Sequence, residues 1–159
     1  MAILWARRAL VADGWRNDVL VETGTDGRIA RVEPDAAPQG TRVATLLPAP
    51  SNLHSHAFQR AMAGMTERRG PPGEPDSFWT WWRTMFAFLD HLAPDDVQAI
   101  TAFAQMEMLE AGFAAVAEFH YLHHRPGGAA YDDLAEMSGR IVAAAAGTGI
   151  GLTLLPVLY

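Results

Sequence analysis

The sequence contains no cysteine, and this absence excludes two kinds of structure. Without cysteine there is no disulfide framework and no thiolate metal site. Long apolar runs are also missing, since none approaches the roughly 20 residues that a membrane-spanning helix needs. The opening residues, MAILWARR, lack the basic-then-apolar order of a secretory signal. We therefore expect a soluble, cytoplasmic protein that does not act at a membrane.

Positive charge is scarce as well. Twelve Lys and Arg residues stand against 18 Asp and Glu residues, a formal net charge of −6, so no basic surface for nucleic acid is expected. Half of the 159 residues are hydrophobic and 19% are charged, which is typical of a globular protein rather than a disordered one.

The first part of the chain, residues 1–47, predicts short strands joined by turns. Thr25-Asp26-Gly27 separates the apolar runs at 18–22 and 28–32, and Asp-Gly between apolar runs is a hairpin signal. Residues 34–40, rich in Pro and Gly, predict a loop. We interpret this part as a portion of a small β-domain that serves as scaffold.

After residue 47 the pattern changes to strands alternating with helices. Helix limits follow from cap residues: Asp76 or Ser77 before the first helix, Gly112 after the second, and Gly147 or Gly149 after the third. The order β, α, α, β, α, β is typical of a parallel sheet with crossover helices. The expected strands are 46–56, 113–119 and 150–158, and the expected helical faces are 78–92, 97–111 and 134–145.

His54 and His56 carry the strongest chemical signal in the sequence. Because a strand repeats every two residues, both imidazoles should project from one face at the C-terminal end of the strand 46–56. Two neutral imidazoles there can bind a divalent metal, and zinc with an open water position is a common source of hydroxide near neutral pH. If they share one ion, their ring nitrogens should lie within roughly 3 to 4 Å of each other. On this pair alone, two surface or core-edge histidines remain an alternative.

Four longer blocks surround and follow this pair: NLHSHAFQRAMAG at 52–64, DSFWTW at 76–81, AEFHYLHH at 117–124 and GIGLTLLPVLY at 149–159. Together they resemble the formimidoylglutamate deiminase family of the amidohydrolase superfamily, and the resemblance runs over essentially the whole chain. The His-x-His strand is typical of the superfamily at large. The other blocks point to this family.

The resemblance implies an α/β protein in two parts. Residues 48–159 would form the first third of a metal-dependent (β/α)8 barrel, with about three strands, and residues 1–47 the N-terminal portion of a β-sandwich domain. A complete barrel takes about 250 residues and eight strands. The chain is therefore expected to be a truncated, N-terminal portion of a longer enzyme.

The same resemblance assigns His54 and His56 as ligands of one zinc ion, although imidazole also suits iron, nickel and copper. The remaining ligands and the proton-transfer residues of the family lie on later strands. We therefore expect the catalytic groups beyond residue 159 and assign none within the chain.

Three residues are candidates for substrate binding. By resemblance Gln59 and Tyr121 contact the substrate, while a loop-bracing hydrogen bond is the alternative for Gln59. An arginine suits a glutamate carboxylate because its planar fork binds both oxygens. The family places that arginine directly after FWTW, but here Trp82 fills the position and Arg83 follows. Arg83 is the third candidate, reaching the substrate through a shifted helix or from a different angle.

Other polar residues follow the second predicted strand. Glu118 and His120 share a strand face, and Glu118 is either a partner that orients a ligand histidine or a polar residue that pairs within the barrel. His123 and His124 belong to the following loop, as packing residues or as part of the site.

The implied activity is hydrolysis of N-formimino-L-glutamate to N-formyl-L-glutamate and ammonia, in histidine degradation. We expect it of the full-length protein, which could form a homodimer, and not of this chain alone. Two alternatives stay open. One is another amidohydrolase deaminase acting on a purine-like ring, and the other is a non-catalytic, truncated module.

Overall fold

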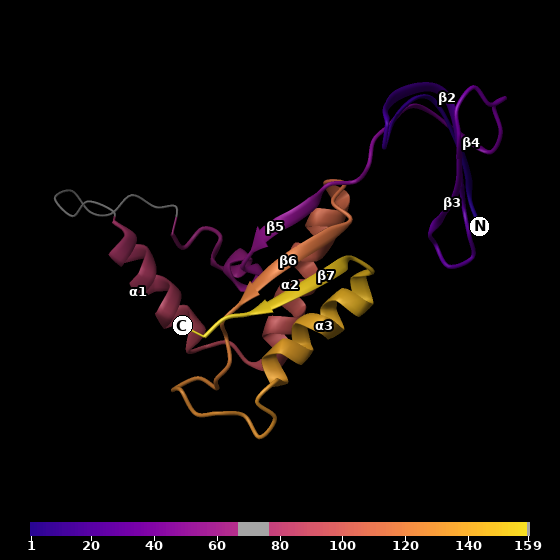
Figure 1. Cartoon of the computed structure of the whole chain (residues 1–159). Helices are drawn as coiled ribbons and strands as arrows, with labels where there is room; N and C mark the ends of the chain where they lie inside the picture. Colours follow the sequence, from indigo (N-terminus) through magenta and orange to yellow (C-terminus); the bar gives the residue numbers. More distant parts are fainter. Residues whose placement is uncertain (67–76, 159) are drawn as a thin grey trace. The chain divides into compact units, whose positions relative to one another are not determined.

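The computed structural model describes residues 1–66 and 77–158. The chain divides into two compact units, Met1–Ala49 and Pro50–Tyr159, which are described separately below (Figure 1). Asp76, one of the two expected N-caps of the first helix, lies outside the described residues.

The first unit is a single four-stranded sheet in the order β3-β2-β1-β4 (Figure 1). The hairpin expected around residues 25–27 is confirmed, because β2 and β3 pair antiparallel on either side of it. A second hairpin turns at Ala12-Asp13 and joins β1 to β2, while β4 pairs with β1 in parallel. The strands are β1 (Ile3–Val11), β2 (Gly14–Thr23), β3 (Ile29–Glu33) and β4 (Thr41–Leu46).

Gly40 allows β4 to approach the first strand. Its φ is +62°, and a Cβ built at this position would lie 2.2 Å from the carbonyl oxygen of Ile3. Only glycine fits both conditions, because other residues disfavour this backbone conformation and would also clash with the strand.

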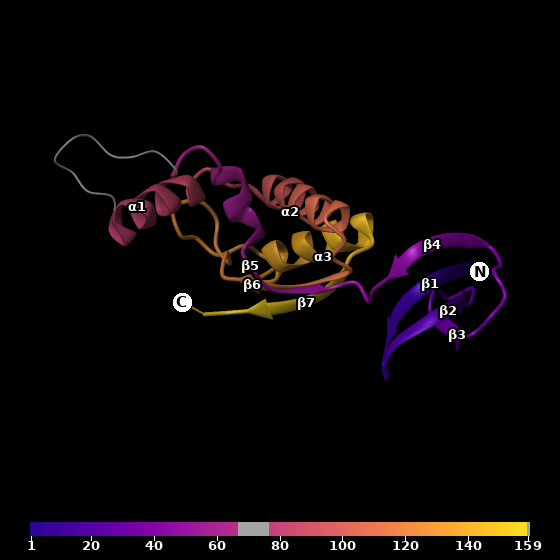
Figure 2. The same ribbon diagram turned by 90° about the horizontal axis from the view of Figure 1, so that it is seen from above.

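The second unit is a three-stranded parallel sheet with helices packed on it. β5 (Ser51–Ser55), β6 (Ala115–His120) and β7 (Gly151–Pro156) follow one another in the order β5-β6-β7, as the strand and helix order predicted. Figure 2 shows α2 (Pro94–Glu110) and α3 (Glu136–Thr148) along one face of this sheet. The chain forms the N-terminal part of a (β/α)8 barrel, with three of its strands.

The expected strand 46–56 is wrong in its first half. β4 ends at Leu46, and pairing resumes only at Ser51, with Pro48 and Pro50 between them. Proline has no N–H to donate to a strand partner and restricts the residue before it, so a continuous strand through both prolines is unfavourable. His54 therefore lies on a short strand of its own, and His56 follows directly after its end.

The cap residues predicted for the helices agree with the structure more closely than the predicted helix lengths do. α1 (Phe78–Leu89) begins after Ser77, whose hydroxyl accepts a hydrogen bond from the Thr80 N–H. α1 ends three residues before Leu92, although Leu92 is buried as expected. Gly149, with φ of +82°, is the residue that ends α3.

The prediction for the third helical face is partly wrong. Met137 and Ile141 are buried, but Leu134 lies before the helix and is 75% exposed, and Val142 is 51% exposed. The apolar spacing identified the helix but not the limits of its buried stripe.

The core of the second unit lies between the sheet and the helices. It is built from buried side chains of the helices and of the segments that connect them: Phe58, Met62, Met85, Leu92, Val97, Leu122, Tyr131, Met137 and Ile141. In the described residues, no helix is both long and apolar enough to cross a membrane.

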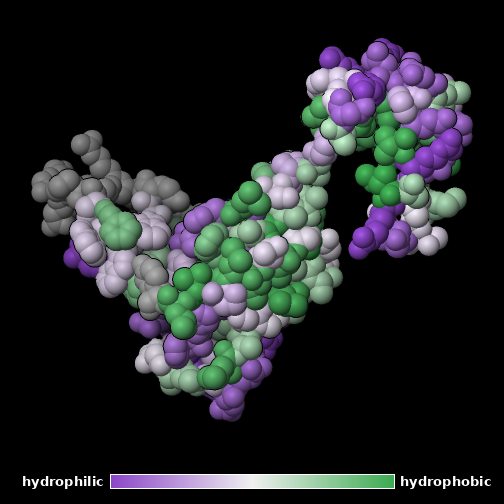
Figure 3. All heavy atoms as spheres, in the orientation of Figure 1, coloured by the Kyte–Doolittle hydropathy of each residue, from purple (hydrophilic) through white to green (hydrophobic). Residues whose placement is uncertain are grey.

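The other face of the sheet carries apolar side chains that the described residues do not cover. The space-filling view shows hydrophobic residues gathered over β5, β6 and β7 (Figure 3). Leu53 on β5 is 74% exposed, while Phe119 on β6 and Leu155 on β7, which pair across the sheet, are half-buried.

Candidate active site at the end of the first barrel strand

His54 and His56 come together at the C-terminal end of β5. Their Nε2 atoms lie 3.1 Å apart, and the two rings meet edge to face with centroids 4.9 Å apart. The predicted separation of roughly 3 to 4 Å is confirmed. Two nitrogens each about 2.0 to 2.1 Å from one tetrahedral ion would be roughly 3.3 Å apart, so this pair fits a divalent metal such as zinc.

Phe119 on the neighbouring strand β6 orients both rings. Its side chain packs against the His54 ring at a centroid distance of 4.7 Å. Its carbonyl oxygen lies 2.9 Å from Nδ1 of His56. Because a carbonyl can only accept, Nδ1 of His56 carries the proton and Nε2 keeps its lone pair, as a metal ligand requires.

Glu118 lies next to Phe119 but bonds the backbone beside His56. It is 3% exposed, and its carboxylate accepts a 2.6 Å hydrogen bond from the Ala57 N–H and a further one from the Ser55 side chain. Burial raises the pKa of this carboxyl above its ordinary value, although both hydrogen bonds act in the opposite direction. Of the two roles the sequence left open, the observed contacts are those of a residue that braces the turn containing His56.

A cavity of about 330 Å³ opens beside His56. Gln59 and Tyr121 both line it, and the Gln59 amide donates a 3.0 Å hydrogen bond to the Tyr121 hydroxyl. His56 and Tyr121 are also in ring contact, with centroids 5.1 Å apart. The other lining residues are Phe78, Trp81, Met85, Phe119 and Val157. Of the five residues predicted for the site, His56, Gln59 and Tyr121 line this cavity and His54 lies beside His56.

Arg83 is the candidate that the structure does not bring to this cavity. Trp81 and Met85 line the cavity from one face of α1, four residues apart. Arg83 is two positions from each, about 200° around the helix, and its side chain is exposed. Trp82, in the position where the family has its arginine, stacks on Phe86 instead.

His120 and His123 form a second pair behind the end of β6. Their ring centroids are 4.9 Å apart, and the His123 ring donates from Nε2 to the carbonyl oxygen of Val157 at 2.8 Å. His120 is 2% exposed, and burial, with a smaller contribution from His123, lowers its pKa to about 4. Within the described part of the chain its Nε2 has no hydrogen-bond partner. His124 lies in the loop after β6, where its backbone forms an isolated antiparallel β-bridge with Ala130.

Phe119, Trp81 and Val157 are site residues that the sequence reasoning missed. Phe119 could have been found from its position, since it alternates with Glu118 and His120 and so faces the same side as the histidine pair. Trp81 and Val157 are at the ends of elements far apart in the sequence, and no local pattern indicates that they share a cavity.

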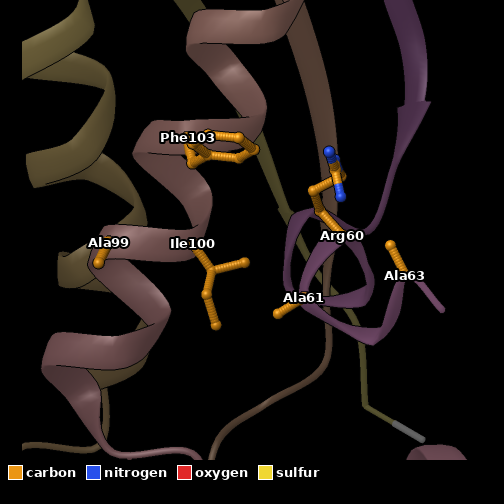
Figure 4. A pocket seen from close by; sticks show the side chains of 6 residues that line it. All are labelled: Arg60, Ala61, Ala63, Ala99, Ile100 and Phe103. Carbon is orange, nitrogen blue, oxygen red and sulfur yellow. The ribbon is translucent and has the colours of Figure 1, made fainter. Parts of the chain in front are cut away.

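A second hollow, of about 360 Å³, lies between the short helix η1 (Ala57–Met62) and α2 (Figure 4). Apart from Arg60 its lining is apolar, and it contains none of the candidate site residues. Arg60 forms a two-point ion pair with Glu107 of α2, at 2.6 and 2.8 Å. This hollow is a contact region between two elements and not a chemical site.

The described residues contain no group of three or more His, Cys, Asp or Glu side chains that could hold a metal ion. Two imidazoles are fewer protein ligands than a zinc site requires. A parallel sheet of consecutive strand and helix units, with paired histidines after the first strand, is the arrangement of an amidohydrolase barrel.

Comparisons with known proteins agree with that class. An amidohydrolase from Brucella melitensis has a solved structure that matches with a TM-score of 0.90 and 45% sequence identity, covering 100% of this chain and 35% of that one. A second match is the zinc complex of atrazine chlorohydrolase TrzN from Arthrobacter aurescens TC1, with 18% sequence identity and a TM-score of 0.72. The match covers 98% of this chain and 35% of that one and shows a shared fold. The chain is thus similar to an amidohydrolase over its whole length and spans about a third of the length of these proteins.

The sequence is also similar to formimidoylglutamate deiminase. Residues 1–42 match the family described as the N-terminal domain of formimidoylglutamate deiminase HutF. The whole chain is 49% identical to the formimidoylglutamate deiminase of Pseudomonas aeruginosa and spans 35% of the length of that protein.

Proposed function

We propose that the full-length protein hydrolyses N-formimino-L-glutamate to N-formyl-L-glutamate and ammonia in histidine degradation, and that this chain supplies two of its metal ligands. One observation carries the proposal. The Nε2 atoms of His54 and His56 lie 3.1 Å apart. Beside them is a cavity whose wall includes Gln59 and Tyr121. The 49% identity to a formimidoylglutamate deiminase supports the choice of substrate.

The resident metal that we propose is zinc. His54 and His56 would hold it through Nε2, with further ligands from later strands, and the unprotonated Nε2 of His56 fits this role. When bound, such an ion activates water for attack and polarises the group under attack. The zinc complex of TrzN, which shares the fold, supports this choice of metal.

The residues of this chain would bind and orient the substrate. The Gln59 amide and the Tyr121 hydroxyl are paired at 3.0 Å on the cavity wall and can turn toward a carboxylate or an amidine nitrogen. Phe78, Trp81 and Met85 line the cavity from α1, and Met85 is buried there. The placement of Arg83 on the opposite side of α1 gives no support to its role as carboxylate anchor, so we assign that anchor to groups outside this chain.

An alternative substrate is favoured by one observation. Four of the eight residues lining the cavity are Phe, Trp or Tyr: Phe78, Trp81, Phe119 and Tyr121. Aromatic walls suit a flat ring, so deamination of a purine-like substrate is the second candidate function.

The experiment compares both substrates in the purified, zinc-loaded, full-length protein. We expect ammonia release from N-formimino-L-glutamate, none from adenosine or guanine, and none from either class after His54→Ala. Glu107→Gln, which removes an exposed ion pair between α2 and η1 and changes no residue of the proposed site, is the matched control and should keep wild-type turnover. Turnover of the purines alone would establish the second candidate. Turnover of neither would leave the non-catalytic module as the better description.

A further inference from the structure

The short helix η1 begins at a residue that cannot cap it. His56 is the N-cap position of η1, and its side chain makes no cap hydrogen bond. Its two ring nitrogens are committed elsewhere, Nδ1 to Phe119 and Nε2 to His54. The first N–H groups of a helix have no partner within the helix, and a buried one left unpaired is costly. Ala57, the first residue of η1, is buried.

Glu118 fills this gap from the neighbouring strand. Its carboxylate accepts from the Ala57 N–H at 2.6 Å, where a negative charge is also favoured by the partial positive charge of a helix start. The same carboxylate bonds the side chain of Ser55, which pairs with Glu118 in the sheet register. The residues on either side of His56 are therefore both held by Glu118.

His56 is fixed at three points as a result. Glu118 bonds the Ser55 side chain before it and the Ala57 N–H after it, and the carbonyl of Phe119, the next residue on β6, holds its ring. Since the backbone position sets where the ring can reach, loss of the Glu118 contacts would let the ring move away from both Phe119 and His54.

We propose that Glu118 is a positioning residue that caps η1 from β6 and thereby holds His56 in the tautomer and place needed to bind metal beside His54. The inference rests on the proposed function for its metal, but the positioning itself can be observed without metal. It extends the site from the two imidazoles to a buried carboxylate that bonds the backbone around them.

The test uses the full-length protein with three substitutions: Glu118→Ala, Glu118→Gln and the control Glu107→Gln. Zinc affinity is measured by competition with a chelating dye, and the His56 tautomer is measured in metal-free protein by NMR of ¹⁵N-labelled histidine. We expect Glu118→Ala to weaken zinc binding by about 10- to 100-fold, as for other residues that orient ligands, and to give a mixture of His56 tautomers. Glu118→Gln keeps an oxygen that accepts from Ala57 and should recover most of the affinity and the Nδ1–H tautomer. Glu107→Gln should behave as wild type.

Each other outcome is decisive. Unchanged affinity and tautomer in Glu118→Ala overturn the proposal, and so does a loss in Glu118→Gln as large as that in Glu118→Ala, because charge rather than capping would then matter. The wild-type protein could bind no zinc while Glu118→Ala still changes the His56 tautomer. That result would support the positioning role and contradict the proposed function. If Glu118→Ala does not fold, Ser55→Ala, which removes one of the two contacts of Glu118, replaces it. A loss of zinc affinity below about 10- to 100-fold together with a shifted His56 tautomer supports the proposal, and wild-type affinity and tautomer overturn it.

Discussion

His54 lies on β5 and His56 directly after it, and different contacts hold the two rings. The His54 ring packs on the Phe119 side chain, whereas the His56 ring is hydrogen-bonded to the Phe119 backbone. Phe119 therefore orients one ring by packing and the other by a directed bond. A side-chain change at Phe119 should disturb His54 more than His56.

Tyr121 offers a direct test of substrate contact. Tyr121→Phe removes the hydroxyl that accepts from Gln59 and leaves the ring in place. If this pair binds substrate, kcat/KM for N-formimino-L-glutamate should fall by about tenfold, the value of one hydrogen bond, mainly through KM. Tyr131→Phe, which removes the hydroxyl of a buried core tyrosine that does not line this cavity, is the matched control. Equal kinetics in Tyr121→Phe and wild type would remove Tyr121 from the substrate site.

His120 should make the stability of the protein depend on pH. Burial lowers its pKa from the ordinary 6.5 to about 4, so between these values the unfolded chain binds a proton that the folded protein does not. The stabilisation is fully present above pH 6.5 and is lost as the pH falls toward 4, by on the order of 3 kcal/mol in all. Urea unfolding of the full-length protein at several pH values in this range measures it. His120→Asn should flatten the dependence, and an equal slope in both proteins would contradict the assignment.

The closeness of the two histidines could be predicted from the sequence because they are two residues apart at a strand end, although the shifted register between Asn52 and Ser55 and the end of β5 at Ser55 were not predicted. The roles of Phe119 and Glu118 could not, since each arises from contacts between β5 and β6, whose paired residues Ser55 and Glu118 are far apart along the chain. The position of Arg83 was also beyond prediction, because the side of α1 that faces the cavity is set by packing.

At the level of elements, the sequence predicted helices and the parallel strand order but missed η1. No Ser, Thr, Asp or Asn precedes Ala57 as a cap, so the usual start signal is absent. The cap comes from Glu118 on another strand, which a local pattern cannot show. The error at 46–50 has the opposite cause, since Pro48 and Pro50 are a local signal that interrupts the strand within the apolar run.

Gly149 and Gly147 give a matched pair of substitutions at the end of α3. Gly149 has φ of +82°, so Gly149→Ala should destabilise this end of the helix by about 1 kcal/mol. Gly147 lies within the helix, and a Cβ added there would have no neighbour within 4 Å, so Gly147→Ala should stabilise it by about 0.5 to 1 kcal/mol. Native-state hydrogen exchange of the α3 amides measures both. If both substitutions changed the stability of α3 in the same direction, the left-handed backbone conformation at Gly149 would not be the reason for glycine at this position.

At the scale of the whole molecule, the bare face of the sheet is the dominant feature of the second unit (Figure 3). Leu53 is 74% exposed, and both β5 and β7 have only one strand neighbour within the described residues. Exposed apolar area costs about 25 cal/mol per Å², and open strand edges invite pairing with other chains.

We therefore expect the 159-residue chain on its own to aggregate or to form a loose, dye-binding compact state. Light scattering during thermal unfolding tests this. Leu53→Lys should reduce scattering more than Leu134→Lys, because the two leucines are equally exposed, at 74% and 75%, but only Leu53 lies on the bare face. A sharp, reversible transition from a monodisperse monomer would show that the chain is a self-sufficient domain.

The order β5-β6-β7 repeats the order of the chain, and this has a consequence for biosynthesis. As the polypeptide leaves the ribosome, each new strand finds its partner already made, so the sheet can grow at one edge while translation continues. The imidazole pair is synthesised before Phe119 and Glu118, and it becomes fixed only when β6 emerges. A nascent chain arrested before residue 115 would then have both histidines but no ordered binding geometry, so metal capture should begin only after the second barrel strand has been translated.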